Sequence, residues 1–416
     1  MFLFFYVFNG VLVENNLSVN PWMLTINGGS SSIKFAVFEM RKTLQEVFRG
    51  SIDRIGGPVS TLQVKGEGLN DELPQEVLAL DYLAAVNILI KWLETRHVSR
   101  NLNAIAYRIV HGGTKYSKPQ KVTKEFMEDF ESLMHFASEH TVKEKILLEG
   151  FLKKFPELPH FVCFDTAFHA DIPQVAKLLP IPRRYESMGL RRYGFHGLSY
   201  EFVMDELSRL EGSDLANGRV VLAHLGSGSS LSAVFKGRSI DTSMGFTPCS
   251  GVPMATRSGD IDPGLFGYLA HTEGMSSKEF EEMLSYKSGL LGLSERSGDM
   301  RDLLCSEASD EKAAEAISLF CYQVKKYIGA FSASLGGLDA LVFTGGIGEN
   351  LPVIRDRICG GLDFLGVILD KDRNALNEGL ISSQTSRVIV RVIPTNEEKV
   401  LAKTTYCMFN STKTKE

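Results

Sequence analysis

The sequence predicts a two-domain protein of the α/β class, and three observations lead to that prediction. The chain has 416 residues, more than one hydrophobic core usually supports. A strand, a glycine–serine turn and a returning strand are expected over residues 24–38 and again over residues 219–235. A third glycine-rich turn, residues 344–350, follows an apolar strand and precedes a helix expected near Pro352. The repeated hairpin indicates two related domains.

Each glycine-rich turn is a candidate anion site. Glycine allows backbone N–H groups to approach a phosphate, and the serine hydroxyls and Lys34 add donors. The second turn, residues 226–230, matches the first only loosely and one residue out of step. An ordinary hairpin remains the alternative for both turns. A glycine turn between a strand and a helix, as at 344–350, is the more specific pattern for a nucleotide.

Charge and composition limit which binding partners and which cellular compartment the sequence predicts. The net charge is −5 with no long basic block, which argues against nucleic acid or an anionic membrane as partner. The six cysteines form no C-x-x-C pair and are expected to be free thiols in a reducing cytoplasm. Residues 1–13 are apolar and uncharged, but too few for the roughly 20 residues of a membrane span. They lack the basic region of a signal peptide, so we interpret residues 1–22 as an extension or an early start, with targeting or docking as the alternative.

Regular elements follow from hydrophobic periodicity and punctuation. Thr141 and Glu144 form a capping-box pattern that predicts the start of a helix. Apolar runs predict strands at 104–110, 161–164 and 339–343, and helical spacing predicts helices at 80–96, 123–136, 142–154, 199–210 and 311–335.

Four polar residues lie where such elements end. Arg108 and Arg257 are expected in glycine-rich loops, where a planar guanidinium clamps carboxylate or phosphate with two hydrogen bonds. Asp165 ends a strand, and His196 lies between glycine and aromatic neighbours. The alternatives are surface ion pairs for the arginines, a turn or cap for Asp165 and a core histidine for His196. Together with the three turns, these residues fit phosphoryl transfer from a nucleoside triphosphate, with Asp165 or Glu397 near Mg²⁺.

Eight motifs in series give a more specific interpretation. In order along residues 23–405, they resemble the signatures of the acetate kinase family, although no Walker A or protein-kinase signature occurs. The motifs are Asn27 to Lys34, Arg108 to Gly113, Phe164 to His169, Tyr193 to Gly197, Met254 to Asp260, Ser297 to Arg301, Gly346 to Asn350 and Pro394 to Glu398.

The resemblance implies two duplicated ribonuclease-H-like domains of the actin-like ATPase type, with a nucleotide cleft between them. It places the extension at residues 1–22, the N-terminal domain at 23–166 plus 395–416, and the C-terminal domain at 167–394. It implies a cytoplasmic enzyme with acetate and ATP as substrates, a homodimer, and Mg²⁺ or alternatively Mn²⁺ as the metal.

The same resemblance assigns roles to particular residues. Asp165, His196 and Arg257 would be catalytic, with His140 a lesser candidate. Arg108, Val110, Phe195 and Pro248 would bind the carboxylate and its methyl group. Asn27 and Glu397 would hold the metal. The ATP site would comprise Lys34, His224, Leu225, Gly226, Ser227, Gly228, Asp299, Met300, Arg301, Gly346, Ile347, Gly348, Glu349 and Asn350.

Two departures from the family pattern bear on specificity. Ser227 replaces the usual asparagine of the second turn, and the H-N-P-P-N run is absent, which places Glu139 where a small apolar residue is usual. A carboxylate beside a carboxylate substrate repels it unless it turns away or is paired. The expected reaction is reversible, direct in-line transfer from ATP to acetate. Propionate or another short carboxylate is the alternative substrate, and a nucleotide-binding protein that has lost catalysis is the alternative class.

Overall fold

The structure, a computed structural model, describes residues 21–41, 43–66, 74–133 and 138–413. Most of the predicted extension, residues 1–20, therefore lies outside the described residues, as do the side chains of Glu139 and His140. Contacts divide the chain into two compact units. Unit 1 comprises the described residues of Met1–Tyr107, Lys143–Phe161 and Ala402–Glu416, and unit 2 those of Arg108–Val142 and Val162–Leu401. The predicted domain boundaries at 166 and 395 stay a prediction.

The first sheet has eight strands in the order β5-β4-β3-β2-β1-β6-β8-β7. Strand β1 is antiparallel to β2 and parallel to β6. The strands are β1 Trp22–Gly28, β2 Ser32–Glu39, β3 Gln45–Asp53, β4 Ser60–Gly66, β5 Gln75–Val77, β6 Leu102–Ile109, β7 Gln120–Lys121 and β8 His160–Phe164. The helices of this part of the sequence are α1 Tyr82–Thr95, α2 Lys124–Leu133 and α3 Ser138–Lys154.

The second sheet, in unit 2, has five strands in the order β11-β10-β9-β12-β13. Strand β9 is antiparallel to β10 and parallel to β12. The strands are β9 Arg219–Leu225, β10 Ser229–Phe235, β11 Arg238–Thr242, β12 Ala340–Thr344 and β13 Ile389–Val392. The helices that follow α3 are α4 Gln174–Lys177, α5 Gly197–Glu211, α6 Ser213–Ala216, α7 Gly264–Glu273, α8 Ser277–Tyr286, α9 Gly289–Ser294, α10 Met300–Ser306, α11 Glu311–Leu335, α12 Gly345–Asn350, α13 Pro352–Cys359, α14 Lys371–Ala375 and α15 Glu397–Lys413.

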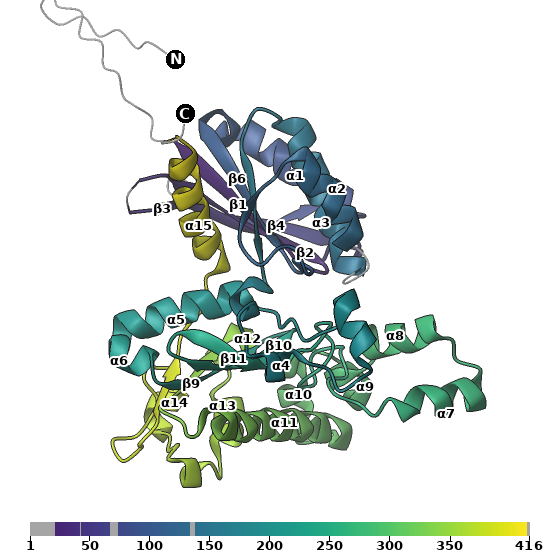
Figure 1. Cartoon of the computed structure of the whole chain (residues 1–416), viewed down its shortest axis with the longest axis vertical. Helices are drawn as coiled ribbons and strands as arrows, with labels where there is room; N and C mark the ends of the chain where they lie inside the picture. Colours follow the sequence, from purple (N-terminus) through teal and green to yellow (C-terminus); the bar gives the residue numbers. More distant parts are fainter. Residues whose placement is uncertain (1–20, 42, 67–73, 134–137, 414–416) are drawn as a thin grey trace, which may run out of the picture. The chain divides into compact units, whose positions relative to one another are not determined.

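The two sheets share one strand order. Strands β3-β2-β1-β6-β8 of the first sheet correspond to β11-β10-β9-β12-β13 of the second. In both, a hairpin of consecutive strands continues into a third antiparallel strand, and the hairpin's first strand pairs in parallel with a later one. This duplication confirms the predicted α/β fold class of two ribonuclease-H-like domains (Figure 1).

Most predicted elements are confirmed, and two predictions are wrong. Helix α11 begins after its N-cap Asp310, whose side chain accepts the N–H of Ala313, and it has the predicted bounds. The predicted turn at 344–350 instead contains the six-residue helix α12. The Thr141 capping box is not a helix start, because α3 already includes Ser138 and buries Thr141 and Glu144 in its interior.

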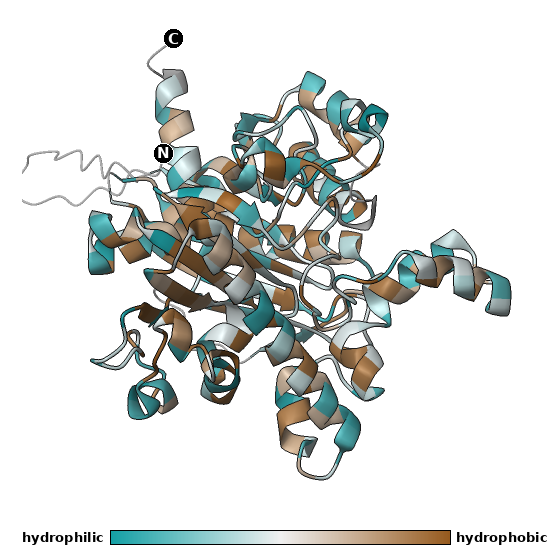
Figure 2. Cartoon of the chain, turned by 60° about the horizontal axis from the view of Figure 1, so that its bottom comes forward, coloured by the Kyte–Doolittle hydropathy of each residue, from teal (hydrophilic) through white to brown (hydrophobic). Residues whose placement is uncertain are grey.

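Hydrophobic residues are concentrated along the strands and on the helix faces that cover them (Figure 2). In unit 2, α11 contacts β9 and β10, and its buried side chains include Phe320, Val324 and Ile328. This cluster extends through β12 and β13 to α13, so the ends of these strands are fixed by a continuous core. Among the described helices, none is long and apolar enough to cross a membrane.

Candidate active site

The turn between β9 and β10 is the centre of the candidate site in unit 2. Leu225 pairs with Ser229, so three residues lie between the strands, and the N–H of Gly226 donates to the carbonyl of Gly228 over 3.1 Å. A Cβ atom on Gly228 would lie 3.2 Å from Nε2 of His196 and 3.5 Å from Nη1 of Arg257. The turn therefore meets an imidazole and a guanidinium, and glycine leaves the least bulk between them.

His196 is held at the N-terminus of α5 in an unusual backbone conformation. Its φ of 61° is left-handed, which a non-glycine residue adopts only when its surroundings compensate the strain. Its Nδ1 is 2.8 Å from Oγ of Ser230, and its ring stacks on that of His224 with centroids 4.3 Å apart. Desolvation of the ring, followed by the charges of His224 and Arg108, lowers the pKa of His196 well below its ordinary value. At neutral pH the ring is therefore a neutral hydrogen-bonding group.

Arg257 lies in the irregular segment between β11 and α7. Its Nη1 donates to the carbonyl oxygen of Pro248 over 3.2 Å, which directs one edge of the guanidinium. Burial lowers the pKa of Arg257, and the nearby charge of Arg108 lowers it further. An arginine remains protonated at neutral pH even so. The site thus holds a buried positive charge next to a neutral imidazole, an arrangement suited to an anion.

Arg108 and Asp165 form a buried pair at the ends of β6 and β8. Nε and Nη2 of Arg108 lie 3.0 Å and 2.5 Å from Oδ2 of Asp165, whose side chain is fully buried. Glu397, at the start of α15, lies 3.8 Å from Nε of Arg108. Within the described residues, Oδ1 of Asp165 is buried and has no hydrogen-bond partner. That oxygen is available to a further ligand.

Val110 and Phe195 belong to a small apolar cluster. Both are almost fully buried, and they pack with Tyr193, Met244 and Met254. Pro248 is outside this cluster but joins the site through its carbonyl oxygen, which accepts the hydrogen bond from Arg257. Unit 2 therefore brings together all seven residues that the sequence analysis assigned to catalysis and carboxylate binding.

The third glycine turn adjoins the second hairpin. Gly345 has a φ of +76°, and a Cβ there would lie 2.7 Å from the carbonyl oxygen of Leu225, so only glycine fits. Oε1 of Glu349 accepts the N–H groups of Gly345 and Thr395 over 2.8 Å and 3.1 Å. Gly346, in contrast, has open space where a Cβ would be. Glu349 therefore fixes the turn, and Gly346 leaves room beside it.

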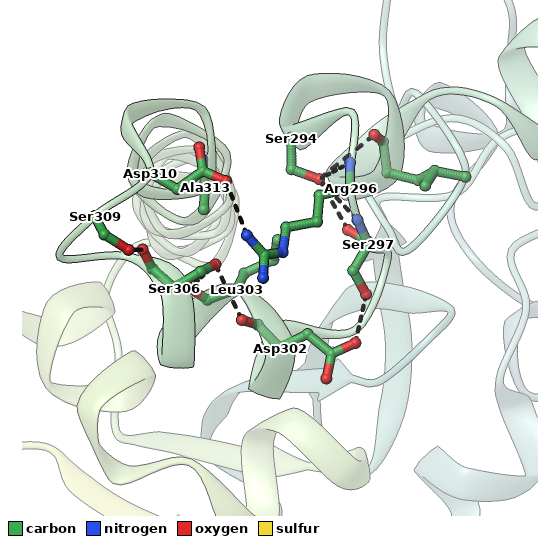
Figure 3. A network of polar contacts seen from close by, with 10 residues as sticks. Ser294, Arg296, Ser297, Asp302, Leu303, Ser306, Ser309, Asp310 and Ala313 are labelled. Carbon is green, nitrogen blue, oxygen red and sulfur yellow. Dashed lines mark hydrogen bonds and ion pairs between the residues drawn. The ribbon is translucent and has the colours of Figure 1, made fainter.

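The predicted residues Asp299, Met300 and Arg301 lie at the start of α10 and are held by local contacts. The carboxylate of Asp299 caps the helix and binds the guanidinium of Arg301, while Met300 is buried. The preceding loop is held by Ser294, whose Oγ accepts the N–H of Ser297, and by the bond from Ser297 Oγ to Asp302 over 2.7 Å (Figure 3). Arg296 pairs with Asp310 at 3.7 Å in the same network (Figure 3).

The first hairpin belongs to unit 1. Asn27 pairs with Lys34 across β1 and β2, the side chain of Asn27 is buried, and Lys34 is exposed. The N–H of Gly29 donates to the carbonyl of Ser32 over 2.8 Å and closes the turn. The roles predicted for Asn27 at the metal and Lys34 at the phosphates stay predictions.

Sequence reasoning missed three side chains that support the site. Ser230 and Tyr200 stand behind His196, and Ser230 could have been suspected from its place in the glycine–serine turn. Arg355 is fully buried and donates to the carbonyl of Gly348 over 2.8 Å and to Oδ1 of Asn374 over 2.8 Å. No local pattern distinguishes Arg355 from a surface arginine of an amphipathic helix.

Comparison with known proteins gives a consistent result. The model of a family described as the acetokinase family matches residues 22–403. The chain is 42% identical over 389 residues to a protein of Rhodopseudomonas palustris named acetate kinase, covering 92% of this chain and 96% of the relative. It is 41% identical over 392 residues to an acetate kinase of Carboxydothermus hydrogenoformans, covering 92% and 98%.

Solved structures agree with the sequence relatives. A propionate kinase from Francisella tularensis subsp. tularensis matches with a TM-score of 0.86 at 34% identity, covering 92% of this chain and 98% of that one. The acetate kinase of Porphyromonas gingivalis matches with a TM-score of 0.82 at 33% identity, covering 94% and 100%.

Proposed function

This chain belongs to the acetokinase family, and we propose that it transfers the γ-phosphoryl group of ATP to acetate, reversibly, giving acetyl phosphate and ADP. The observation that carries the proposal is the approach of His196 Nε2 and Arg257 Nη1 to the Gly228 turn. A buried cation, a neutral donor and a glycine turn in one place suit the equatorial oxygens of a phosphoryl group in transfer.

The reaction is a direct displacement. An oxygen of the acetate carboxylate forms a bond to the γ-phosphorus as the bond to the β,γ-bridging oxygen breaks, and ADP leaves with that electron pair. A carboxylate is already ionised at neutral pH, so no general base is needed. Catalysis then depends on orientation and charge stabilisation, with Arg108 orienting the carboxylate and Arg257 and His196 contacting the phosphoryl oxygens.

A magnesium ion fits the oxygen atoms that unit 2 supplies. Oδ1 of Asp165 is buried without a hydrogen-bond partner among the described residues, and Glu397 supplies a second carboxylate near Arg108. Among those residues, no group of three or more His, Cys, Asp or Glu side chains could hold a metal. This sparse set suits Mg²⁺, which keeps waters and takes substrate phosphates as ligands; Mn²⁺ could replace it. When bound, the ion would neutralise phosphate charge, and Asn27 is our remaining candidate ligand.

We place ATP along the hairpin turn His224 to Gly228 and the turn from Gly346 to Asn350. The distance of 3.8 Å between a Cβ position on Gly226 and the N–H nitrogen of Gly346 supports one continuous surface from both turns. Lys34 and the segment from Asp299 to Arg301 are the other proposed ATP contacts.

Acetate is the proposed carboxylate because the apolar cluster of Val110 and Phe195 is small and closely packed. The match to a propionate kinase makes propionate the alternative to test. Steady-state kinetics with acetate, propionate and butyrate should give the highest kcat/KM for acetate. A higher value for propionate would overturn the substrate assignment but not the reaction.

The reaction itself is tested by incubating the protein with ATP, Mg²⁺ and acetate and trapping the product with hydroxylamine. We expect acetyl hydroxamate to form in proportion to the ADP released. Normal ATP binding without hydroxamate would favour the alternative of a nucleotide-binding protein that has lost catalysis.

We also propose a homodimer in the cytoplasm. Helices α7 and α8 of unit 2 have no fully buried residues and expose Leu265, Phe266 and Tyr268, with Tyr268 67% exposed. Such a group of apolar side chains is typical of an interface. The free state of all six cysteines supports a reducing compartment. Light scattering should give twice the monomer mass of 46.1 kDa.

A further inference from the structure

Three side chains form a hydrogen-bonded chain behind the candidate phosphoryl site. The hydroxyl of Tyr200 lies 2.5 Å from Oγ of Ser230, and that Oγ lies 2.8 Å from Nδ1 of His196. Tyr200 and Ser230 are both fully buried. His196 is the residue directly before α5 and Tyr200 lies in the first turn of that helix, and both side chains reach Ser230 of β10.

The number of protons available shows which atom donates in each of these two hydrogen bonds. Within the described part of the chain, the hydroxyl of Tyr200 has Ser230 as its hydrogen-bond partner, and Ser230 Oγ has Tyr200 and His196. Burial raises the pKa of Tyr200, so the phenol keeps its proton, and it donates that proton to Ser230. The single hydroxyl proton of Ser230 is then available only to His196. If Nδ1 donated instead, Ser230 would receive two donors and its own buried proton would lack an acceptor.

We propose that Tyr200 and Ser230 are positioning residues that fix His196 as the tautomer with its proton on Nε2. Nδ1 then accepts from Ser230, and Nε2–H is presented as a donor at the Gly228 turn. The proposal rests on the proposed function only for what that donor contacts, the phosphoryl oxygens. The tautomer itself can be measured without any substrate.

The surroundings of Nε2 agree with a donor there. A Cβ position on Gly228 lies 3.2 Å from Nε2 and 3.5 Å from Nη1 of Arg257, so the two nitrogens approach the same point. Arg257 has only donors to offer. With Nε2 protonated, both side chains present N–H groups to one place, which is the pattern that an anion requires. The other tautomer would direct a lone pair toward the incoming phosphate oxygens and repel them.

The direct test is histidine nitrogen NMR on the full chain labelled with ¹⁵N-histidine. His196 is assigned by the signal that disappears in His196→Gln. We expect Nδ1 of His196 to resonate as an unprotonated nitrogen and Nε2 as a protonated one, without substrate at neutral pH. A protonated Nδ1 in the wild-type protein would overturn the proposal.

Tyr200→Phe tests the origin of the tautomer with almost no change of shape. Without the phenol proton, Ser230 no longer has to donate to Nδ1, so we expect a mixture of tautomers. The kcat should fall about tenfold, the lower end of the loss seen when the partner that orients a metal-ligating histidine is removed, with KM for ATP and acetate nearly unchanged. An unchanged tautomer signal together with unchanged kcat would overturn the role of Tyr200.

Ser230→Ala removes both bonds and should lower kcat further, again with little change in KM. The matched control is Ser232→Ala, two residues along β10 and equally buried, whose hydroxyl bonds to Ser239 and Asp241. Ser232→Ala should leave the tautomer of His196 and kcat unchanged. Equal losses of kcat in Ser230→Ala and Ser232→Ala would indicate only a structural effect and would overturn the positioning role of Ser230. If the wild-type tautomer is as proposed but no acetyl hydroxamate forms, the proposed function fails and the positioning chain stands.

Discussion

The two hairpins, β1–β2 in unit 1 and β9–β10 in unit 2, have the same topology and different surroundings. In the first, four residues lie between the last paired residues, Gly28 and Ile33; in the second, three lie between Leu225 and Ser229. The strand ends of the second hairpin carry His224 and Ser230, which contact the ring of His196. The first hairpin ends in a buried asparagine and an exposed lysine.

This difference indicates that the two hairpins have different functions, catalysis at the second and nucleotide binding at the first. The duplicated fold places a glycine–serine turn in each unit, and we propose that both turns contact phosphate. His196 and Arg257, the side chains that we propose contact the phosphoryl group in transfer, are found around the second turn. We therefore expect substitutions near the second turn to affect kcat and those near the first to affect nucleotide binding.

The largest expected effect is that of Arg257→Ala. Loss of an arginine that stabilises a phosphoryl group in transfer should lower kcat by about 10³ or more, roughly 4 kcal/mol. Lys34→Ala, the counterpart at the first hairpin, should mainly raise KM for ATP. Steady-state kinetics of both variants test the division, with Arg209→Ala, an exposed helix-surface pair, as control. Equal effects on kcat from Arg257→Ala and Lys34→Ala would break the comparison.

As pH falls, unit 2 should lose stability before unit 1. Burial lowers the pKa of His111 and of His169 to about 4, so the unfolded chain, with a pKa near 6.5, binds more protons between these values. Their stabilising contribution is complete above pH 6.5 and is lost as pH falls toward 4, about 3 kcal/mol for each histidine. Both lie in unit 2. Burial also lowers the pKa of His160 in unit 1, so the comparison sets two such histidines of unit 2 against one of unit 1.

Unit 2 should therefore unfold at higher pH than unit 1. Both tryptophans of the chain, Trp22 and Trp92, lie in unit 1. In an acid titration, hydrogen exchange followed by mass spectrometry should show loss of protection in unit 2 at a higher pH than the change in tryptophan fluorescence. A fluorescence change at the same pH as the loss of protection in unit 2, or at a higher pH, would contradict this order.

Arg108→Ala should mainly raise KM for acetate, by about 10- to 100-fold, because charged hydrogen bonds contribute about 1.5–3 kcal/mol. The variant also leaves the buried carboxylate of Asp165 without its cation, so its thermal stability should be measured in parallel. Arg108→Lys keeps the charge but not the bidentate geometry, and it should recover stability more than KM. An unchanged KM in a stably folded Arg108→Ala would exclude the clamp.

The smallest predicted effect compares the two turns directly. A Cβ on Gly228 would lie 3.2 Å from Nε2 of His196 and crowd its ring, and it would touch Nη1 of Arg257 at 3.5 Å. A Cβ on Gly29 would meet Oγ of Ser32 at 2.9 Å, which is the movable end of a side chain. Gly228→Ala should lower kcat about tenfold, equivalent to about 1.4 kcal/mol. Gly29→Ala should change kcat by less than about twofold, whereas about 1.36 kcal/mol would correspond to a tenfold change. The opposite ranking would show that the first turn is the more constrained.

The repeated hairpin was predictable from sequence because strand alternation and glycine turns are local signals. Helix α11 was equally clear from the helical spacing of residues 311–335, whereas its cap by Asp310 was found only in the structure. Helix α12 was missed because its glycines resemble a turn, and the bond from Gly345 to Glu349 that stabilises it depends on packing. Thr141 matched a capping box, but its burial inside α3 shows that tertiary contacts outweighed the local pattern.

Within the site, residue types could be predicted and pairings could not. Arg108 and Asp165 are 57 residues apart, and only the adjacent ends of β6 and β8 bring them together. Ser230 and Tyr200 gain their significance from the proton count behind His196, which requires coordinates. Arg355 supports α12 from within the core, where composition gives no signal for a buried charge.

The central claim is that the groups around Gly228 bind the phosphoryl group in transfer more strongly than they bind ATP. Calorimetry should compare wild type and Arg257→Ala for ATP alone and for ADP, acetate and aluminium fluoride together, an analogue of the transferring group. We predict that the variant loses about 100-fold or more in affinity for the analogue and less than about threefold for ATP. Equal losses for both ligands would contradict the claim, because Arg257 would then bind the ground state and the transition state alike.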